Sequence, residues 1–275
     1  MAEPHLAAVV QLTSTADVPR NLRRAAELAE RAASRGAMLV VLPENVAFLG
    51  PEEEKLQVCE AFEPGAPPQG PIGRALRDVA KRTRVWALWG GLPERTTDPT
   101  RTYNTSVLVD PAGSLVARYR KIHLFDVALA DGTTLTESRT VLPGDAVVTA
   151  ETPVGRLGLS ICYDLRFPEL YRRLVDQGAT VLTVPAAFTV PTGKDHWHVL
   201  LRARAIESQC HLLAAAQWGS HGNGRTTYGH ALIVDPWGTV LAECGDGEGI
   251  ALAELDQSRT ERVRATLPSL RHRRL

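Results

Sequence analysis

The sequence predicts an α/β fold built from two similar halves, and three patterns support this. Apolar strands alternate with amphipathic helices, as where the strand 38–42 follows a helix expected over residues 21–35. A strand that is apolar at every position is typical of burial on both faces. An Asp-Pro-x-Gly turn between two strands occurs in each half, over residues 107–116 and again over residues 232–241. We therefore expect two mixed sheets packed against each other with helices outside, a four-layer α-β-β-α sandwich.

The individual elements follow from hydrophobic periodicity and from the positions of Gly and Pro. In the first half we expect strands at 6–12, 38–42 and 85–92 and helices at 21–35 and 71–84. In the second half we expect strands at 156–161, 180–184 and 212–217 and helices at 167–176, 195–208 and about 256–266. No linker or low-complexity segment separates these elements, so residues 1–275 are expected to form one domain.

Composition excludes several classes of protein. Lys plus Arg number 31 and Asp plus Glu also number 31, so the net charge is zero and no nucleic acid or membrane partner is expected. No apolar stretch approaches the roughly 18 residues that span a bilayer, and we expect a cytoplasmic protein. The four cysteines, Cys59, Cys162, Cys210 and Cys244, form no Cys-x-x-Cys pair and are expected to be free thiols.

Three residues stand where α/β enzymes present reactive side chains. Cys162 follows an apolar strand and precedes a helix, whose first N–H groups stabilise a thiolate or an oxyanion. Glu44 follows the strand that ends at Leu42 and is placed to act as a general base. Lys121 ends the first hairpin, and its ammonium can stabilise an anionic intermediate. Each also has an ordinary explanation, as a buried inert thiol, a helix-capping or ion-paired acid and a surface lysine.

Together the three motifs resemble those of the nitrilase, or carbon-nitrogen hydrolase, superfamily. Leu42-Pro43-Glu44 is similar to its glutamate motif, residues 119–124 to its lysine motif and residues 161–169 to its cysteine motif. The resemblance covers nearly the full length of the chain. It implies a Glu-Lys-Cys amidase in an α-β-β-α fold that needs neither a metal nor an organic cofactor.

Further segments resemble the Nit branch of this superfamily, and they are residues 196–207, 228–230, 234–238 and 267–274. The branch contains amidases for ω-amides of small carboxylic acids, such as deaminated glutathione or 2-oxo acid monoamides. The resemblance implies hydrolysis through a cysteine thioester with release of ammonia. Residues 269–271 replace a more apolar spacer, so the subtype stays open. Aliphatic amidase, N-carbamoyl hydrolase and nitrilase activities, or a non-catalytic scaffold, are the alternatives.

The resemblance also implies a role for each catalytic residue. Glu44 would accept the proton of Cys162, and the thiolate would attack the amide carbonyl. Lys121 and the backbone N–H of Tyr163 would hold the oxyanion. Glu137 would lie beside Lys121 and keep it charged and oriented, although an ordinary loop acid is equally consistent with its sequence context.

The same resemblance implies residues that bind substrate. Arg166 would pair with a substrate carboxylate, or alternatively would tie its own loop. Phe188 and Thr192 are expected as pocket walls, and Tyr163 is expected to bind substrate as well. His196 and His198 form a His-x-His pair, but no third ligand stands at helical spacing from them, so no metal site is expected.

Two further interpretations concern the partner of Cys162 and the assembly. A different catalytic arrangement would pair Cys162 with His123 or His211, as in papain-like proteases. By resemblance the protein is expected to be a homo-oligomer, a dimer or tetramer, with the tail over about residues 256–275 packing on a neighbouring subunit. A small-molecule amide is the expected substrate.

Overall fold

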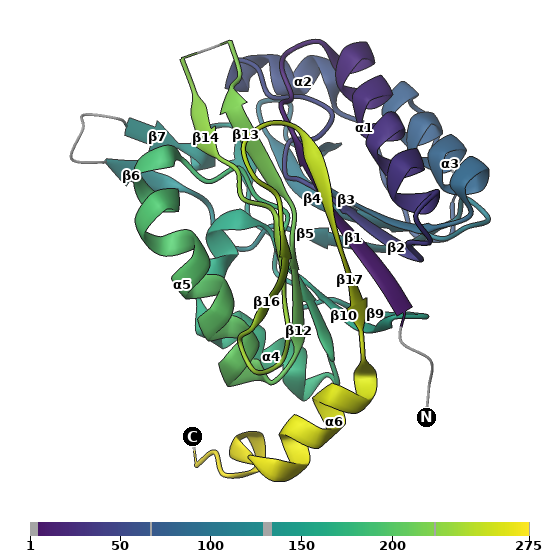
Figure 1. The fold of residues 1–275 in the computed structure, drawn as a ribbon. Helices are drawn as coiled ribbons and strands as arrows, with labels where there is room; N and C mark the ends of the chain where they lie inside the picture. The colour runs from purple at the N-terminus through teal and green to yellow at the C-terminus, as the bar shows by residue number, and fades with distance from the viewer. Residues whose placement is uncertain (1–4, 67, 129–133, 223, 275) are drawn as a thin grey trace.

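The computed structural model describes residues 5–66, 68–128, 134–222 and 224–274 (Figure 1). The sequence analysis expected one domain over residues 1–275. Residues 1–4 and residue 275, the last of the tail, lie outside the described residues. Within the described ranges, helices and strands alternate through both halves of the chain.

The first half alternates strands with helices as expected. Its strands are β1 His5–Leu12, β2 Leu39–Leu42, β3 Trp86–Arg95, β4 Thr102–Val109, β5 Leu115–Arg120, β6 Asp126–Ala128, β7 Thr134–Thr136 and β8 Val141–Leu142. Its helices are α1 Val18–Ala33, α2 Lys55–Val58 and α3 Pro71–Thr83, with single 3₁₀ turns η1 Glu52–Glu54 and η2 Glu137–Arg139.

The second half repeats this alternation. Its strands are β9 Thr149–Thr152, β10 Gly155–Leu159, β11 Val181–Thr183, β12 His211–Ala214, β13 Ala216–Ser220, β14 Thr226–Tyr228, β15 Leu232–Val234, β16 Val240–Glu243 and β17 Gly249–Leu255. Its helices are α4 Pro168–Asp176, α5 Val190–Ser208 and α6 Gln257–Thr266, with 3₁₀ turns η3 Cys162–Arg166 and η4 Ser269–Arg271.

The described strands form two large sheets and one small ribbon. The larger sheet has the order β14-β13-β1-β2-β3-β4-β5, with β17 also paired to β1 and β8 to β4. The smaller has the order β16-β15-β12-β11-β10-β9, and β6 pairs with β7. In each sheet the central strands are parallel, β1–β3 in one and β10–β12 in the other, and an antiparallel hairpin follows, β4–β5 or β15–β16. The duplicated hairpins of the sequence thus occupy matching places.

Side chains that alternate along one strand show how the layers pack. On β1, Ala7 and Val9 join the core that contains the strands of the smaller sheet. Ala8 and Val10 join a second core with α1 and α3. Successive strand residues point to opposite faces, so β1 is covered by a sheet on one side and by helices on the other. Figure 1 shows α1 and α3 outside the larger sheet and α4 and α5 outside the smaller one, which confirms the α-β-β-α sandwich.

The structure differs from the sequence-based prediction at several element boundaries. Helix α1 begins at Val18 because Asp17 caps it, accepting a hydrogen bond from the backbone N of Arg20. Helix α5 begins at Val190 with a proline in its first turn, five residues earlier than expected. The single strand expected over 212–217 was wrong, because β12 pairs in the smaller sheet and β13 in the larger. The apolar run identifies burial but not the change of sheet.

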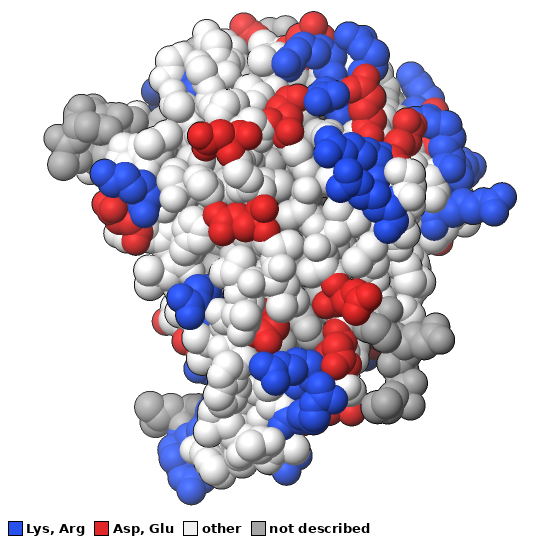
Figure 2. All heavy atoms as spheres, viewed as in Figure 1, with Lys and Arg blue, Asp and Glu red and all other residues white. Residues whose placement is uncertain are grey.

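The structure shows how charge is distributed on one face of the molecule and the state of the four cysteines. On the face shown in Figure 2, basic and acidic side chains are interspersed, and Lys and Arg are densest over α1 and α3. Among the described residues, no helix has both the length and the apolar character that crossing a bilayer requires. All four cysteines are free and buried.

Candidate active site

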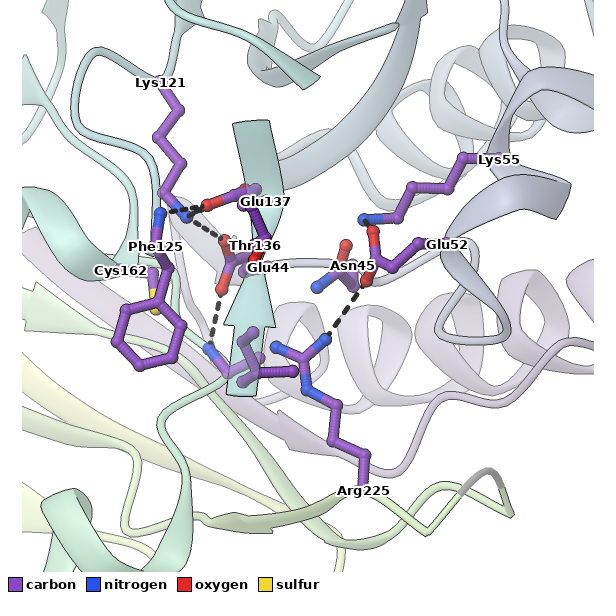
Figure 3. Close-up of a pocket in the computed structure, with 12 residues that line it drawn as sticks. Glu44, Asn45, Glu52, Lys55, Lys121, Phe125, Thr136, Glu137, Cys162 and Arg225 are labelled. Carbon is purple, nitrogen blue, oxygen red and sulfur yellow. Dashed lines mark hydrogen bonds and ion pairs between the residues drawn. The ribbon is translucent and has the colours of Figure 1, made fainter. Parts of the chain in front are cut away.

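Glu44, Lys121, Glu137 and Cys162 line one cavity of about 460 Å³ (Figure 3). Glu44 follows the end of β2, Lys121 directly follows β5, and Cys162 follows the end of β10. The cavity therefore collects residues from both sheets at strand ends, as in many α/β enzymes. The four side chains that the sequence singled out as catalytic are brought together.

The turn that carries Cys162 has an uncommon backbone conformation. Cys162 has a positive φ of 49°, which is unfavourable for a residue with a side chain. Two contacts hold this conformation. The backbone N of Cys162 donates to the carbonyl of Pro185 at 2.9 Å, and Asp164 Oδ2 accepts from the backbone N of Ile161 at 2.9 Å. The surrounding hydrogen bonds thus stabilise a strained turn that presents the thiol to the cavity.

Asp164 is a buried residue whose role the sequence analysis missed. It accepts hydrogen bonds from the Tyr119 hydroxyl at 2.7 Å and from His123 Nδ1 at 2.7 Å, besides the one from Ile161. A fully buried carboxylate requires such partners. Asp164 therefore fastens the cysteine turn to the segment that leads from β5 into Lys121. An acidic residue two positions after the cysteine is the only sequence signal for it.

Lys121 forms the centre of a buried ion cluster. Its Nζ lies 3.0 Å from Oε1 of Glu44 and 2.7 Å from Oε2 of Glu137, and its side chain is 2% exposed. Burial lowers the pKa of Lys121, but the carboxylates of Glu137 and Glu44 outweigh burial and raise it well above its ordinary value. Burial likewise raises the pKa of Glu137, but Lys121 outweighs it and brings the value to about 2. Both groups are therefore charged at neutral pH.

Asn104, the third residue of β4, is a second residue that the sequence analysis missed. Its Nδ2 donates to Glu44 Oε1 at 2.9 Å and to Glu137 Oε1 at 3.0 Å. The same two oxygens accept from Lys121, so Asn104 fixes the spacing of the two carboxylates independently of charge. Nothing in the sequence distinguishes this asparagine, because its function depends on strand pairing.

The thiol of Cys162 lies beside the carboxylate of Glu44. Burial, followed by the negative charge of Glu44, raises the pKa of Cys162 well above its ordinary value, although Lys121 opposes this. The sulfur is therefore a neutral thiol at rest. Glu44 is held by a hydrogen bond from the backbone N of Ala187 to its Oε2 at 2.9 Å. The arrangement supplies a base next to a nucleophile that must lose a proton before it can react.

The residues expected to bind substrate line a second, smaller cavity of about 210 Å³, which shares Phe125, Cys162 and Ala187 with the first. Tyr163, Arg166, Phe188 and Thr192 are all among its lining residues. The Arg166 guanidinium lies 5.4 Å from the centre of the Phe188 ring and contacts Nδ1 of His196 at 3.3 Å. An arginine over an aromatic ring at the rim of a cavity is well placed to pair with a carboxylate.

The far wall of the larger cavity carries charges that the sequence analysis did not single out. Lys55 Nζ lies 2.6 Å from Glu52, and Arg225 lies 3.4 Å from the same carboxylate. Figure 3 shows these three side chains across the cavity from Lys121. Among the described residues, this wall thus carries the two cations Lys55 and Arg225 together with the carboxylate of Glu52. Lys55 and Arg225 are far apart in the sequence, so only the fold reveals the pairing.

The two histidines considered as partners for Cys162 lie elsewhere. His123 Nδ1 bonds to Asp164, and its ring stacks on Phe167 at 3.7 Å between centres. His211 pairs in register with Val181, which pairs with Leu157, so it lies at the amino ends of the parallel strands. Cys162 lies beyond their carboxyl ends. The structure instead brings Glu44 and Lys121 into the cavity that the Cys162 thiol lines.

Comparison with known proteins relates this site to a family. The sequence profile described as Carbon-nitrogen hydrolase matches residues 6–265. The chain is 49% identical to a deaminated glutathione amidase of Synechocystis sp. over 98% of both chains. It is 42% identical to the deaminated glutathione amidase of Homo sapiens over 98% of this chain and 82% of the human one.

Solved structures give the same relationship. Saccharomyces cerevisiae Nit3, a member of branch 10 of the nitrilase superfamily, is 34% identical with a TM-score of 0.87, over 97% of this chain and 95% of Nit3. The Caenorhabditis elegans NitFhit protein is 38% identical with a TM-score of 0.89. That match covers 100% of this chain and 66% of the NitFhit chain.

Proposed function

Because the chain belongs to the carbon-nitrogen hydrolase family and is an enzyme that hydrolyses amides, we propose that it cleaves the ω-amide of deaminated glutathione or of a related 2-oxo acid. The observation that carries this proposal is the cluster in which Lys121 joins Glu44 and Glu137 beside the Cys162 thiol. The identity to deaminated glutathione amidases over nearly the full chain supports the substrate.

In the first step Glu44 takes the proton of the Cys162 thiol as the sulfur attacks the amide carbonyl. A carbon–sulfur bond forms, and the carbonyl electron pair moves to the oxygen. Lys121 and the backbone N–H of Tyr163 stabilise this oxyanion. The raised pKa of Cys162 supports this order of events, because the thiolate forms only as the carbonyl is attacked.

In the second step the carbon–nitrogen bond breaks, and the leaving nitrogen takes the proton from Glu44. A thioester remains on Cys162. Glu44 then removes a proton from water, the hydroxide oxygen bonds to the carbonyl carbon, and the sulfur leaves and regains its proton. The sequence analysis expected ammonia as the leaving group, and this holds for a primary amide. Deaminated glutathione is a secondary amide, so its leaving group would instead be the amino group of cysteinylglycine.

The two cavities divide the substrate at the scissile bond. The leaving nitrogen must lie beside Glu44, in the larger cavity, because Glu44 protonates it. The acyl chain then extends into the smaller cavity, where Arg166 pairs with its carboxylate and Tyr163, Phe188 and Thr192 enclose it. We assign these four residues to substrate binding on this basis.

Assembly and compartment are further parts of the proposal. We propose a homodimer in which exposed apolar residues of α5 and of the β15–β16 turn meet those of a second copy, and these include Val199, Ile206 and Trp237. Helix α6 packs on its own chain, with Arg264 donating to the carbonyls of Ala179 and Gln209. Residues 269–274, most of which are exposed, are the part of the tail that we propose contacts a neighbouring subunit. Four free thiols favour the reducing cytoplasm.

The proposal is tested by turnover of three substrates, deaminated glutathione, 2-oxoglutaramate and a simple aliphatic amide. We expect the highest kcat/KM with deaminated glutathione and, by mass spectrometry, an acyl adduct on Cys162. Glu44→Gln and Lys121→Ala should each lower kcat by about a hundredfold or more. The absence of both turnover and adduct with all three substrates would favour a non-catalytic scaffold.

A matched histidine variant separates this mechanism from a cysteine–histidine pair. His123→Ala should still form the acyl adduct, because His123 contacts Asp164 and Phe167. Loss of the adduct in His123→Ala with retention in Glu44→Gln would overturn the assignment of the base. Circular dichroism of each variant controls for folding.

A further inference from the structure

A group of three potential metal ligands lies outside both cavities of the active site. His198 comes from α5, His230 follows β14, and Glu243 ends β16. One ligand atom from each lies within 4.8 Å of the other two. None of the three lines either cavity. The helical spacing that argued against a metal at His198 does not apply, because the other ligands come from distant segments.

The geometry of this group is close to that of a metal centre. His198 Nε2 lies 2.8 Å from Oε1 of Glu243, and His230 Nδ1 lies 2.7 Å from the same oxygen. Ligands at about 2.0 Å in a tetrahedral zinc site lie about 3.3 Å apart, so each of these two nitrogen–oxygen distances must widen by about 0.5 Å, while the two nitrogens lie within 4.8 Å of each other. In the single chain all three side chains are about one-third exposed, which permits this movement and lets an ion enter from solvent before His198, next to Val199 on α5, is brought near the proposed dimer interface.

The structure around the group orients the ligands. His230 has a positive φ of 58° and follows Gly229, where an added Cβ would lie 2.3 Å from Trp218. The carbonyl of His230 accepts a hydrogen bond from Trp197 Nε1 at 2.8 Å. A backbone fixed by packing on both sides directs the His230 ring toward Glu243, so its position does not depend on a metal.

We propose that His198, His230 and Glu243 form a binding site for a divalent transition metal of the zinc type, with water as the fourth ligand. Two imidazoles and one carboxylate are a donor set that zinc prefers and that magnesium and calcium do not. Each imidazole must present a lone pair to the ion. The protons that now lie between the rings and Glu243 therefore move to the other ring nitrogens or to solvent.

Zinc and cobalt binding to the full chain test the site. We use Cys162→Ala protein throughout, so that the active-site thiol does not compete. We expect one zinc ion per chain by calorimetry and none with magnesium. Cobalt should give the visible absorption of a four-coordinate site without a thiolate charge-transfer band.

Single substitutions assign the ligands. His198→Gln and Glu243→Gln should each weaken zinc binding about tenfold or more, because each removes one of three protein ligands. The matched control is His196→Gln, on the same helix and exposed, which contacts Arg166 and should bind zinc unchanged. Equal zinc affinity in all three variants, a thiolate band, or no binding at 100 µM zinc would overturn the proposal.

Discussion

Glu44 has both of its oxygens engaged before any substrate binds. Oε1 accepts from Lys121 and Asn104, and Oε2 accepts from the backbone N of Ala187. Holding a base in one orientation reduces the reorganisation that the reaction would otherwise require. Because Asn104 and Lys121 donate to Glu137 as well, the two carboxylates are fixed relative to each other.

A substitution of Arg225 tests which leaving group the substrate carries. Arg225 lies with Lys55 and Glu52 on the wall of the larger cavity, where the proposed mechanism puts the leaving nitrogen. Cysteinylglycine carries a carboxylate at its far end, whereas ammonia carries none. We expect Arg225→Ala to raise KM for deaminated glutathione about tenfold and to leave KM for 2-oxoglutaramate nearly unchanged.

Steady-state kinetics with both substrates measures this difference. Arg23→Ala, an exposed arginine on α1, is the control for a general loss of positive charge. An equal rise in KM for both substrates would show that Arg225 does not recognise the leaving group.

Whether a site residue can be predicted from the sequence depends on whether it stands in a local motif. Glu44, Lys121 and Cys162 stand in contiguous motifs next to strand ends, so sequence alone singled them out. Asn104 and Arg225 have no such local context. They reach the site through strand pairing and loop position, which a single sequence does not encode in a visible pattern.

At the scale of elements, an irregularity in the pairing of β3 with β4 positions the general base, Glu44. The register of this pair shifts between Trp89 and Leu92, and Gly91 lies in the shift with a φ of 61°. The Gly91 carbonyl accepts from the backbone N of Asn45 at 3.0 Å. A bulge with a glycine thus lets β3 approach the segment that carries Glu44.

Gly91→Ala tests this dependence. An added Cβ would lie 2.6 Å from Cγ of Glu44, so the carboxylate must move. We expect kcat to fall about tenfold or more, and the melting temperature to fall by several degrees. The control is Gly222→Ala, where φ is 82° but, within the part of the chain that the structure describes, no atom beyond the neighbouring residues lies within 4 Å of the added Cβ. If both variants keep the same kcat, the close approach at Gly91 does not matter for catalysis.

Element existence was more predictable than element boundaries. The strand at β2 and the helix at α3 follow directly from apolar runs and from Pro71, and both appear within one residue of the expected ends. The segment 212–217 was misread as one strand because the apolar run over residues 212–216 continues from β12 into the first residue of β13. Which sheet receives each strand depends on partners that are distant in the sequence.

At the scale of the whole molecule, packing two sheets face to face leaves the outer helices to make contact with other molecules. Helix α5 is buried on one side against the smaller sheet, yet Val199 is 67% exposed and Ile206 47% exposed on its other side. An alanine Cβ at Gly238 would lie 2.6 Å from Ile206, so the β15–β16 turn, with Trp237 54% exposed, adjoins this helix. Exposed apolar side chains gathered on one side of a protein are typical of an interface.

The proposed homodimer predicts a molar mass of twice 29.9 kDa by light scattering after size-exclusion chromatography. The double variant Val199→Glu with Trp237→Glu should elute as a monomer with an unchanged circular dichroism spectrum, because charges at the centre of an apolar interface cannot be solvated there. Val116→Glu, on β5 and 39% exposed, is the control and should remain dimeric. A monomeric wild-type protein, or a double variant that keeps the dimer mass, would exclude this face as the interface. The interface residues lie outside both cavities, so the same double variant shows whether turnover requires the second copy.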